Sequence, residues 1–176
     1  VSGRKLLEQA LHSVKQAFDS FKQVEFKVPN NARVAGVHMH NDEAITISIF
    51  PPARVDLVGS FLLGTSARPN VNVDMCLELP KQQLYEKDYL DCRYFHKRAL
   101  CVAAYADALV KLTQPPPSEK KKSKPKKHKK QEEEPASPAS PLLNWSVSVV
   151  RFRGDILKPI IELLPPKGSR GLLKHS

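Results

Sequence analysis

The stretch that decides the fold is Gly59-Ser60-Phe61-Leu62-Leu63-Gly64-Thr65, followed shortly by Asn72-Val73-Asp74. The apolar run Val55–Val58 before it predicts one strand, and residues 71–79 predict another. The Gly-Ser pair between them predicts a turn that leads into a brief helix. Asn72 and Asp74 are one residue apart, so on a strand both side chains point to the same face. The stretch therefore predicts a strand–turn–helix–strand unit that presents an amide beside a carboxylate.

This unit resembles the beginning of the active site in DNA polymerase β-type nucleotidyltransferases. The resemblance implies that Gly59 and Ser60 are the remnant of a turn that meets a nucleotide triphosphate. In active members, two aspartates one residue apart hold two magnesium ions. Asn72 stands at the first of these positions, and a neutral amide does not replace a carboxylate that bridges two hard dications. An ordinary strand–turn–helix–strand unit, with Asp74 as a strand-edge or cap residue, remains the alternative.

Active members of this superfamily also need a third carboxylate on a later strand. No Asp or Glu follows Glu162 in this chain. Asp155 falls in a predicted turn, and Glu162 lies within the strand that precedes the required position, so the third acid either lies beyond Ser176 or is missing. Asp74 alone could bind one magnesium ion only weakly, so the charge stabilisation that phosphoryl transfer needs is missing. We therefore predict no catalytic residue, no metal site, no cofactor and no enzymatic activity.

Two stretches carry a closer family resemblance. They are VGSFLLGTSARPNVNVDMCLELP at Val58–Pro80 and YFHKRAL at Tyr94–Leu100. Both resemble the first domain of the Nrap family, the nucleolar RNA-associated proteins. The resemblance is good from about Phe50 to Leu112 and again around Leu157–Pro166, and it is absent from the lysine-rich insert.

The resemblance implies an α+β fold: a nucleotidyltransferase (DNA polymerase β-like) mixed sheet covered by helices. It also implies a nuclear, nucleolar protein that serves as an inactive RNA- and protein-binding scaffold in small-subunit ribosome biogenesis and pre-rRNA processing. The implied partners are pre-ribosomal RNA and proteins of the small-subunit processome, with no membrane and no small-molecule substrate.

Two other functions stay open at this point. The first is an active template-independent RNA nucleotidyltransferase with an altered metal site. The second is a nucleotide sensor, in which Gly59 and Ser60 hold a triphosphate without turnover. Asn72 and the missing third acid count against the enzyme.

Hydrophobic periodicity predicts the remaining elements. Apolar residues at helical spacing indicate a helix over about 4–21, and a second helix without Gly or Pro is expected over 87–112, with Leu90 and Tyr94 on its buried side. Arg33–His40 and Ala44–Phe50 are predicted to pair as a hairpin. Further strands are expected at Trp145–Phe152 and Ile156–Leu164, with Pro159 favouring an edge or a bulge. We expect residues 44–79 and 145–164 to share one mixed sheet under the two helices.

Residues 1–176 are expected to be a fragment of one nucleotidyltransferase-like domain, the N-terminal portion of a larger protein and incomplete at the C-terminus. Residues 113–141, rich in Pro, Lys and Glu, are predicted to be a disordered insert within that domain. Its run Lys120–Lys130 favours a nuclear-import signal or an RNA tether over a merely solubilising loop.

The net charge of +10 slightly favours a polyanionic partner over a role in solubility alone, because residues 119–134 account for only +4 of it. Arg93, Lys97 and Arg98, interleaved with aromatics, are the candidate RNA contacts, although such a cluster is as often a solvated helix face. His38 and His40 lack a third ligand and are read as surface histidines. The remaining candidates are Cys76, Cys92 and Cys101, which form no CxxC pair and predict free thiols. No apolar stretch approaches the ~20 residues that span a bilayer.

Overall fold

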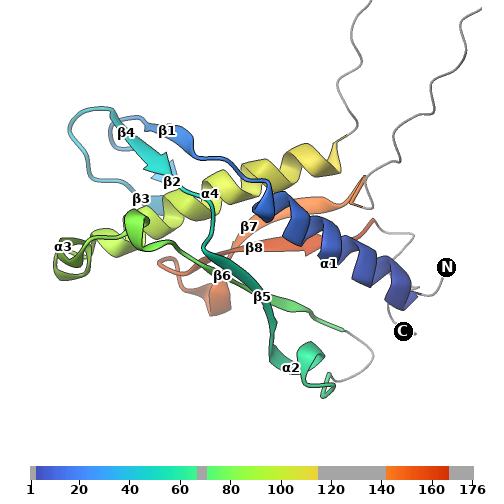
Figure 1. Ribbon diagram of the computed structural model, residues 1–176. Helices are drawn as coiled ribbons and strands as arrows, with labels where there is room; N and C mark the ends of the chain where they lie inside the picture. Colours follow the sequence, from blue (N-terminus) through green and yellow to red (C-terminus); the bar gives the residue numbers. More distant parts are fainter. Residues whose placement is uncertain (1–2, 67–70, 115–141, 167–176) are drawn as a thin grey trace, which may run out of the picture.

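Figure 1 shows the computed structural model, which describes residues 3–66, 71–114 and 142–166. The helices are α1 (Gly3–Asp19), α2 (Gly59–Leu62), α3 (Glu86–Leu90) and α4 (Arg93–Thr113), with 3₁₀ turns η1 (Lys81–Gln83) and η2 (Phe152–Gly154). The strands are β1 (Val24–Val28), β2 (Arg33–Val34), β3 (Val37–His38), β4 (Ile45–Ile49), β5 (Arg54–Val58), β6 (Asp74–Glu78), β7 (Ser146–Arg151) and β8 (Pro159–Leu164). The mixed α and β content is as predicted. The expected disorder of residues 113–141 falls, beyond Gln114, outside the described residues.

The amphipathic N-terminal helix is confirmed. Ala10, Val14 and Phe18 are buried at spacings of four residues and form one stripe of α1. This stripe belongs to the same hydrophobic core as the buried side of α4, which passes the upper end of α1 in Figure 1. The two longest helices therefore share one apolar core.

The predicted pairing of 33–40 with 44–50 is wrong. β4 pairs instead with β1, in antiparallel register from Val24 opposite Ile49 to Val28 opposite Ile45. Residues 33–38 close on themselves as the small hairpin β2–β3. Ala35 and Gly36 both have positive φ, at 49° and 84°, which suits a two-residue hairpin turn and breaks the expected straight strand.

The predicted single mixed sheet is also corrected. In the described part of the chain the strands form four two-stranded antiparallel sheets: β1–β4, β2–β3, β5–β6 and β7–β8. β8 pairs with β7, and β6 pairs with β5. Packing still unites them, because Leu142, Trp145 and Ile161 belong to the same core as α1 and α4. β8 begins at Pro159, three residues later than predicted, because a proline without an N–H suits the first position of a strand.

The long helix predicted over 87–112 is two helices. Cys92 has a left-handed backbone with φ of 58°, which ends α3 and redirects the chain into α4. The buried side of α4 includes Leu100, Tyr105 and Leu109. Leu90, expected on that side, lies before the break and is 82% exposed.

The three cysteines are free thiols, as predicted: Cys76 and Cys92 are exposed, and Cys101 is buried. Burial raises the pKa of the Cys101 thiol to about 12, so this side chain stays protonated and behaves as a small apolar group. In the segments that the structure describes, no helix is both long enough and apolar enough to cross a bilayer.

Candidate functional site

The predicted strand–turn–helix–strand unit is present. β5 runs into Gly59 and the single turn of α2, and the chain returns through Gly64 to β6. The antiparallel register places Val58 opposite Asp74, so the start of the helix lies against the start of the second strand. Figure 1 shows this unit projecting from the body beside α1, with α2 at its tip.

The backbone conformation at position 59 and the closeness of Asp74 both require a glycine there. Its φ is +77°, and a Cβ atom at this position would lie 2.7 Å from the Oδ2 atom of Asp74. A side chain here would thus carry the strain of the left-handed region and also displace the carboxylate. The glycine of the motif therefore lets the Asp74 carboxylate approach the turn.

The matched test is a pair of glycine-to-alanine variants. Gly64 also has positive φ, +68°, but none of the described residues lies within 4 Å of its would-be Cβ atom. We expect Gly64→Ala to lower the free energy of unfolding by about 1 kcal/mol, from backbone strain alone. Gly59→Ala should cost more, because it adds the clash with Asp74, and chemical denaturation measures the difference. Equal losses for the two variants would contradict the proposed close packing of Gly59 on Asp74.

Ser60 is exposed at the start of α2 and its polar atoms have local partners. Its Oγ atom lies 3.4 Å from the Oγ atom of Ser66, and its carbonyl accepts a hydrogen bond from the Thr65 N–H at 2.9 Å. These contacts close the loop after α2 on itself. The hydroxyl remains at the surface, where a ligand could reach it.

The side chains of residues 71–79 alternate as the sequence predicted. Asn72 and Asp74 are exposed, while Val71, Val73 and Met75 are partly buried. The strand predicted over residues 71–79 is shorter, because β6 begins at Asp74, so Asn72 lies just before it. Within the described residues, no cluster of three or more His, Cys, Asp or Glu side chains is arranged to hold a metal ion.

The two acids that the sequence offers after residue 141 are Asp155 and Glu162. Asp155 accepts hydrogen bonds from Lys158 Nζ and from the Leu157 N–H, both at 2.9 Å, and so belongs to the turn between β7 and β8. The hydrogen bond from Lys158 is the main cause that lowers the pKa of Asp155, and the charge of Arg98 adds to it. Glu162 is exposed on β8, opposite Ser148 of β7.

A groove of about 990 Å³ runs beside the candidate site. Residues of β6 and β8 line it together with side chains of α1 and α4. Its polar lining includes Asn72, Asp74, Arg98 and Glu162, and much of its remaining surface is core: Phe18, Tyr105 and Leu109. Arg98, one of the three predicted RNA contacts, thus lies in the same groove as the Asn–Asp pair.

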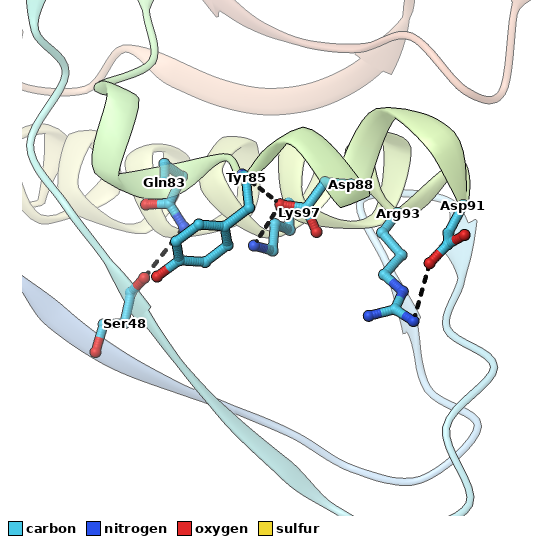
Figure 2. A network of polar contacts seen from close by, with 7 residues as sticks. All are labelled: Ser48, Gln83, Tyr85, Asp88, Asp91, Arg93 and Lys97. Carbon is cyan, nitrogen blue, oxygen red and sulfur yellow. Dashed lines mark hydrogen bonds and ion pairs between the residues drawn. The ribbon is translucent and has the colours of Figure 1, made fainter.

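The other two basic candidates have carboxylate partners, as Figure 2 shows. Lys97 donates to Asp88 Oδ2 at 2.7 Å, with its side chain only 17% exposed, and its ammonium lies 4.5 Å from the centroid of the Tyr85 ring. Arg93 is an exposed side chain paired with Asp91 at 3.1 Å. The ammonium group of Lys97 is therefore already paired within the chain, which counts against a role in binding phosphates.

Asp88 is a key residue that sequence reasoning missed. Its carboxylate also accepts the Tyr85 N–H at 2.7 Å, which caps the beginning of α3. Burial alone would raise the pKa of Asp88, but the hydrogen bonds from Lys97 and Tyr85 and the charges of Lys97 and Arg93 outweigh it and lower the pKa. The signal in the sequence was an acid three residues after the residue that starts a short helix.

Gln83 is the second missed polar residue. It is buried, and its amide group donates to the Ser48 carbonyl at 3.1 Å and accepts from the Phe50 N–H at 3.0 Å. One side chain thus ties the segment before α3 to the end of β4. The rings of His38 and His40 lie on the surface, tilted by 34° with their centroids 4.6 Å apart, and His96 forms a hydrogen bond with the His38 carbonyl.

The sequence of this chain matches one protein family over most of its length. The family described as Nrap protein domain 1 matches this α+β chain over residues 8–175. The chain belongs to the Nrap family.

Curated relatives agree with this assignment. Human "Nucleolar protein 6" is 52% identical over 61 residues, which are 35% of this chain and 5% of the relative. The Xenopus laevis protein of the same name is 45% identical over 62 residues, again 35% of this chain and 5% of the relative. The Drosophila yakuba protein is 29% identical over 119 residues, 68% of this chain and 8% of the relative. The chain thus spans a small fraction of these relatives, whose shared name places the family in the nucleolus.

Proposed function

We propose that this chain is a catalytically inactive nucleotidyltransferase-like module that acts as an RNA- and protein-binding scaffold in nucleolar ribosome biogenesis. Its membership of the Nrap family supports the nucleolar setting. The finer part of the proposal is a place in the small-subunit processome, with pre-ribosomal RNA as one partner. The positive charge carried outside residues 119–134 supports a polyanionic partner.

The observation that carries the proposal is Asn72 beside Asp74. Both side chains are exposed and Asp74 lies against the glycine turn, where two-metal catalysis would require two carboxylates. The amide brings no negative charge, so two magnesium ions would face a single carboxylate. The competing function, an RNA nucleotidyltransferase with an altered metal site, has to work without that charge.

A primer-extension assay separates the two functions. The full-length protein is incubated with RNA primers and radiolabelled nucleotides, with magnesium or manganese. We expect no incorporation, and we expect none from Asn72→Asp, since the described residues hold no cluster of three or more His, Cys, Asp or Glu side chains that could bind the metal ions. Asp74→Ala is the control for contaminating polymerase. Incorporation that disappears in Asp74→Ala would overturn the proposal and establish the enzyme.

A further inference from the structure

The turn that joins β7 to β8 carries positive charge at the surface. Residues 151–158 read RFRGDILK, and Asp155 is the only acid among them. Arg151 and Arg153 are exposed, and neither forms an ion pair with another described residue. Asp155 is paired with Lys158 at 2.9 Å, so it neutralises neither arginine. In Figure 1 the turn lies at the end of the β7–β8 hairpin that is remote from α1.

The neighbouring β2–β3 hairpin extends this basic surface. The Nε atom of Arg151 lies 4.0 Å from the would-be Cβ atom of Gly36, so this arginine reaches the turn of that hairpin. The hairpin carries the exposed Arg33, and its residues 33–38 include no acid. Two exposed arginines from different elements therefore belong to one basic region.

The acids of the β7–β8 hairpin do not cancel this charge. The charge of Arg98 on α4 acts on Asp155 in addition to the hydrogen bond from Lys158, which places another cation near the turn. Glu162, the remaining acid of the hairpin, is exposed three pairs further along the ladder, opposite Ser148. The turn thus has a local excess of positive charge that does not depend on the net charge of the whole chain.

An exposed ring lies within this basic surface. Phe152 is 46% exposed, and the guanidinium carbon of Arg153 lies 5.3 Å from the centroid of its ring. Unpaired nucleobases stack on aromatic rings and on guanidinium planes, while guanidinium N–H groups bind phosphates. A ring between two unpaired arginines therefore has the chemistry of a site for single-stranded nucleic acid.

The backbone at Arg153 indicates that its side chain serves more than the turn. Its φ and ψ are 52° and 32°, in the left-handed region where a residue with a Cβ atom is strained. A glycine would adopt this conformation without strain, as Gly154 does next to it with φ of 80°. Strain of this kind is typical of functional positions.

The ring decides between two polyanionic partners. Single-stranded RNA and an acidic protein would both be attracted by the arginines. Carboxylates make no use of an exposed ring, whereas RNA supplies phosphates for the arginines and a base for the ring. In a duplex the faces of the bases are covered by their neighbours, so only an unpaired base can reach Phe152.

We propose that the turn surface, defined as Arg151, Phe152 and Arg153, binds single-stranded RNA. The arginines pair with phosphates, and one base stacks on the exposed part of the Phe152 ring. This inference rests on the proposed scaffold function and names one of its RNA contacts. It moves that contact away from Arg93 and Lys97, which already have carboxylate partners.

The first test is a crosslinking experiment on the full-length protein. A uridine-rich single-stranded RNA that contains 4-thiouridine is bound to the protein and irradiated. An endoproteinase that cleaves after glutamate leaves residues 135–162 as one peptide, and mass spectrometry locates the adducts. We expect a nucleotide adduct on this peptide at Phe152 or beside it, because a stacked base lies in contact with the ring.

The second test measures affinity for the same RNA by fluorescence anisotropy. Phe152→Ala should weaken binding at least about fivefold, the size expected for one lost base stack. Arg153→Gly should weaken it about fivefold at ~0.1 M salt, and should lower the slope of log affinity against log salt by about 0.7, the value for one phosphate contact to a single strand. Arg153→Gly should not lower the unfolding midpoint, since glycine suits the backbone at this position.

The matched control is Arg54→Gln. The side chain of Arg54 is 70% exposed and pairs with Asp56 and Glu78 on the β5–β6 hairpin. This variant removes the same charge from the whole chain but leaves the turn surface unchanged. It should bind RNA like the unchanged protein, so the control separates a contact at the turn from a general effect of net charge.

Adducts only on other peptides, or equal losses in Arg153→Gly and Arg54→Gln, would overturn the inference. Binding of polyglutamate by the same variants tests the acidic protein as partner. The inference fails if Phe152→Ala weakens polyglutamate binding and leaves RNA binding unchanged. If the full-length protein binds RNA and the turn variants have no effect, the inference fails while the scaffold function stands. If the unchanged protein binds no RNA, the RNA part of the proposed function fails as well.

Discussion

Asp88→Ala is expected to lower the free energy of unfolding by about 3 kcal/mol, because removing one partner of a buried ion pair leaves the other charge uncompensated. The side chains of Asp88 and Lys97 are 5% and 17% exposed. The same change removes the acceptor of the Tyr85 N–H at the start of α3. Urea denaturation of the chain, followed by circular dichroism, measures the loss.

The exposed pair at the same helix junction provides the matched control. Arg93 and Asp91 are joined at 3.1 Å, but their side chains are 64% and 51% exposed. Asp91→Ala should therefore cost less than about 1 kcal/mol, as exposed ion pairs usually do. Similar losses for Asp88→Ala and Asp91→Ala would show that burial of the Asp88–Lys97 pair does not matter.

The Asp88 contribution also has a defined pH dependence. The pKa of Asp88 is lower in the folded protein than its ordinary value of 3.8. The folded state then holds fewer protons than the unfolded state, so the stabilisation is complete above pH 3.8 and is lost as the pH falls through the lowered pKa. The stability difference between the unchanged chain and Asp88→Asn should shrink over that acidic range.

The parts of the fold that the sequence predicted well are those in which periodicity alone decides the outcome. The stripe of α1 and the alternation along residues 71–79 follow from repeats of 3.6 and 2 residues. The break at Cys92 could not be found this way, because a left-handed backbone at a non-glycine residue depends on tertiary contacts. The prediction of strand pairing was wrong for the same reason. β1 is far from β4 in sequence, and the turn at Ala35 and Gly36 leaves β4 free to pair with β1.

At the candidate site, too, the local features could be predicted from the sequence and the tertiary contacts could not. The Gly59 turn and the alternating exposure along residues 71–79 follow from local geometry, and both are present. Which basic residues remain available could not be predicted, since Lys97 is occupied by an acid nine residues earlier and on another helix. A cluster of charges in a sequence does not show which of them already have partners.

The second large effect is expected at Tyr105, which lies at the centre of the core. Tyr105 is 1% exposed, and its ring meets those of Phe18 and Phe21 edge to face at 5.6 and 5.2 Å. Tyr105→Ala should lower the free energy of unfolding by about 3–5 kcal/mol, from the lost burial and the cavity left behind. Thermal denaturation with calorimetry measures it.

Removing only the hydroxyl group of Tyr105 distinguishes the contribution of its hydrogen bond from that of its packing. This hydroxyl donates to the Phe50 carbonyl at 2.8 Å, while Gln83 accepts the N–H of the same residue. Two side chains thus satisfy both backbone groups at the end of β4, where Pro51 cannot supply a donor.

Tyr105→Phe keeps the ring but leaves the Phe50 carbonyl without its donor, and should lower the free energy of unfolding by about 1–3 kcal/mol. Tyr89→Phe, at an exposed ring, should cost almost nothing. If Tyr105→Phe were equally harmless, the hydroxyl would have no part in joining α4 to β4, and packing alone would hold that contact.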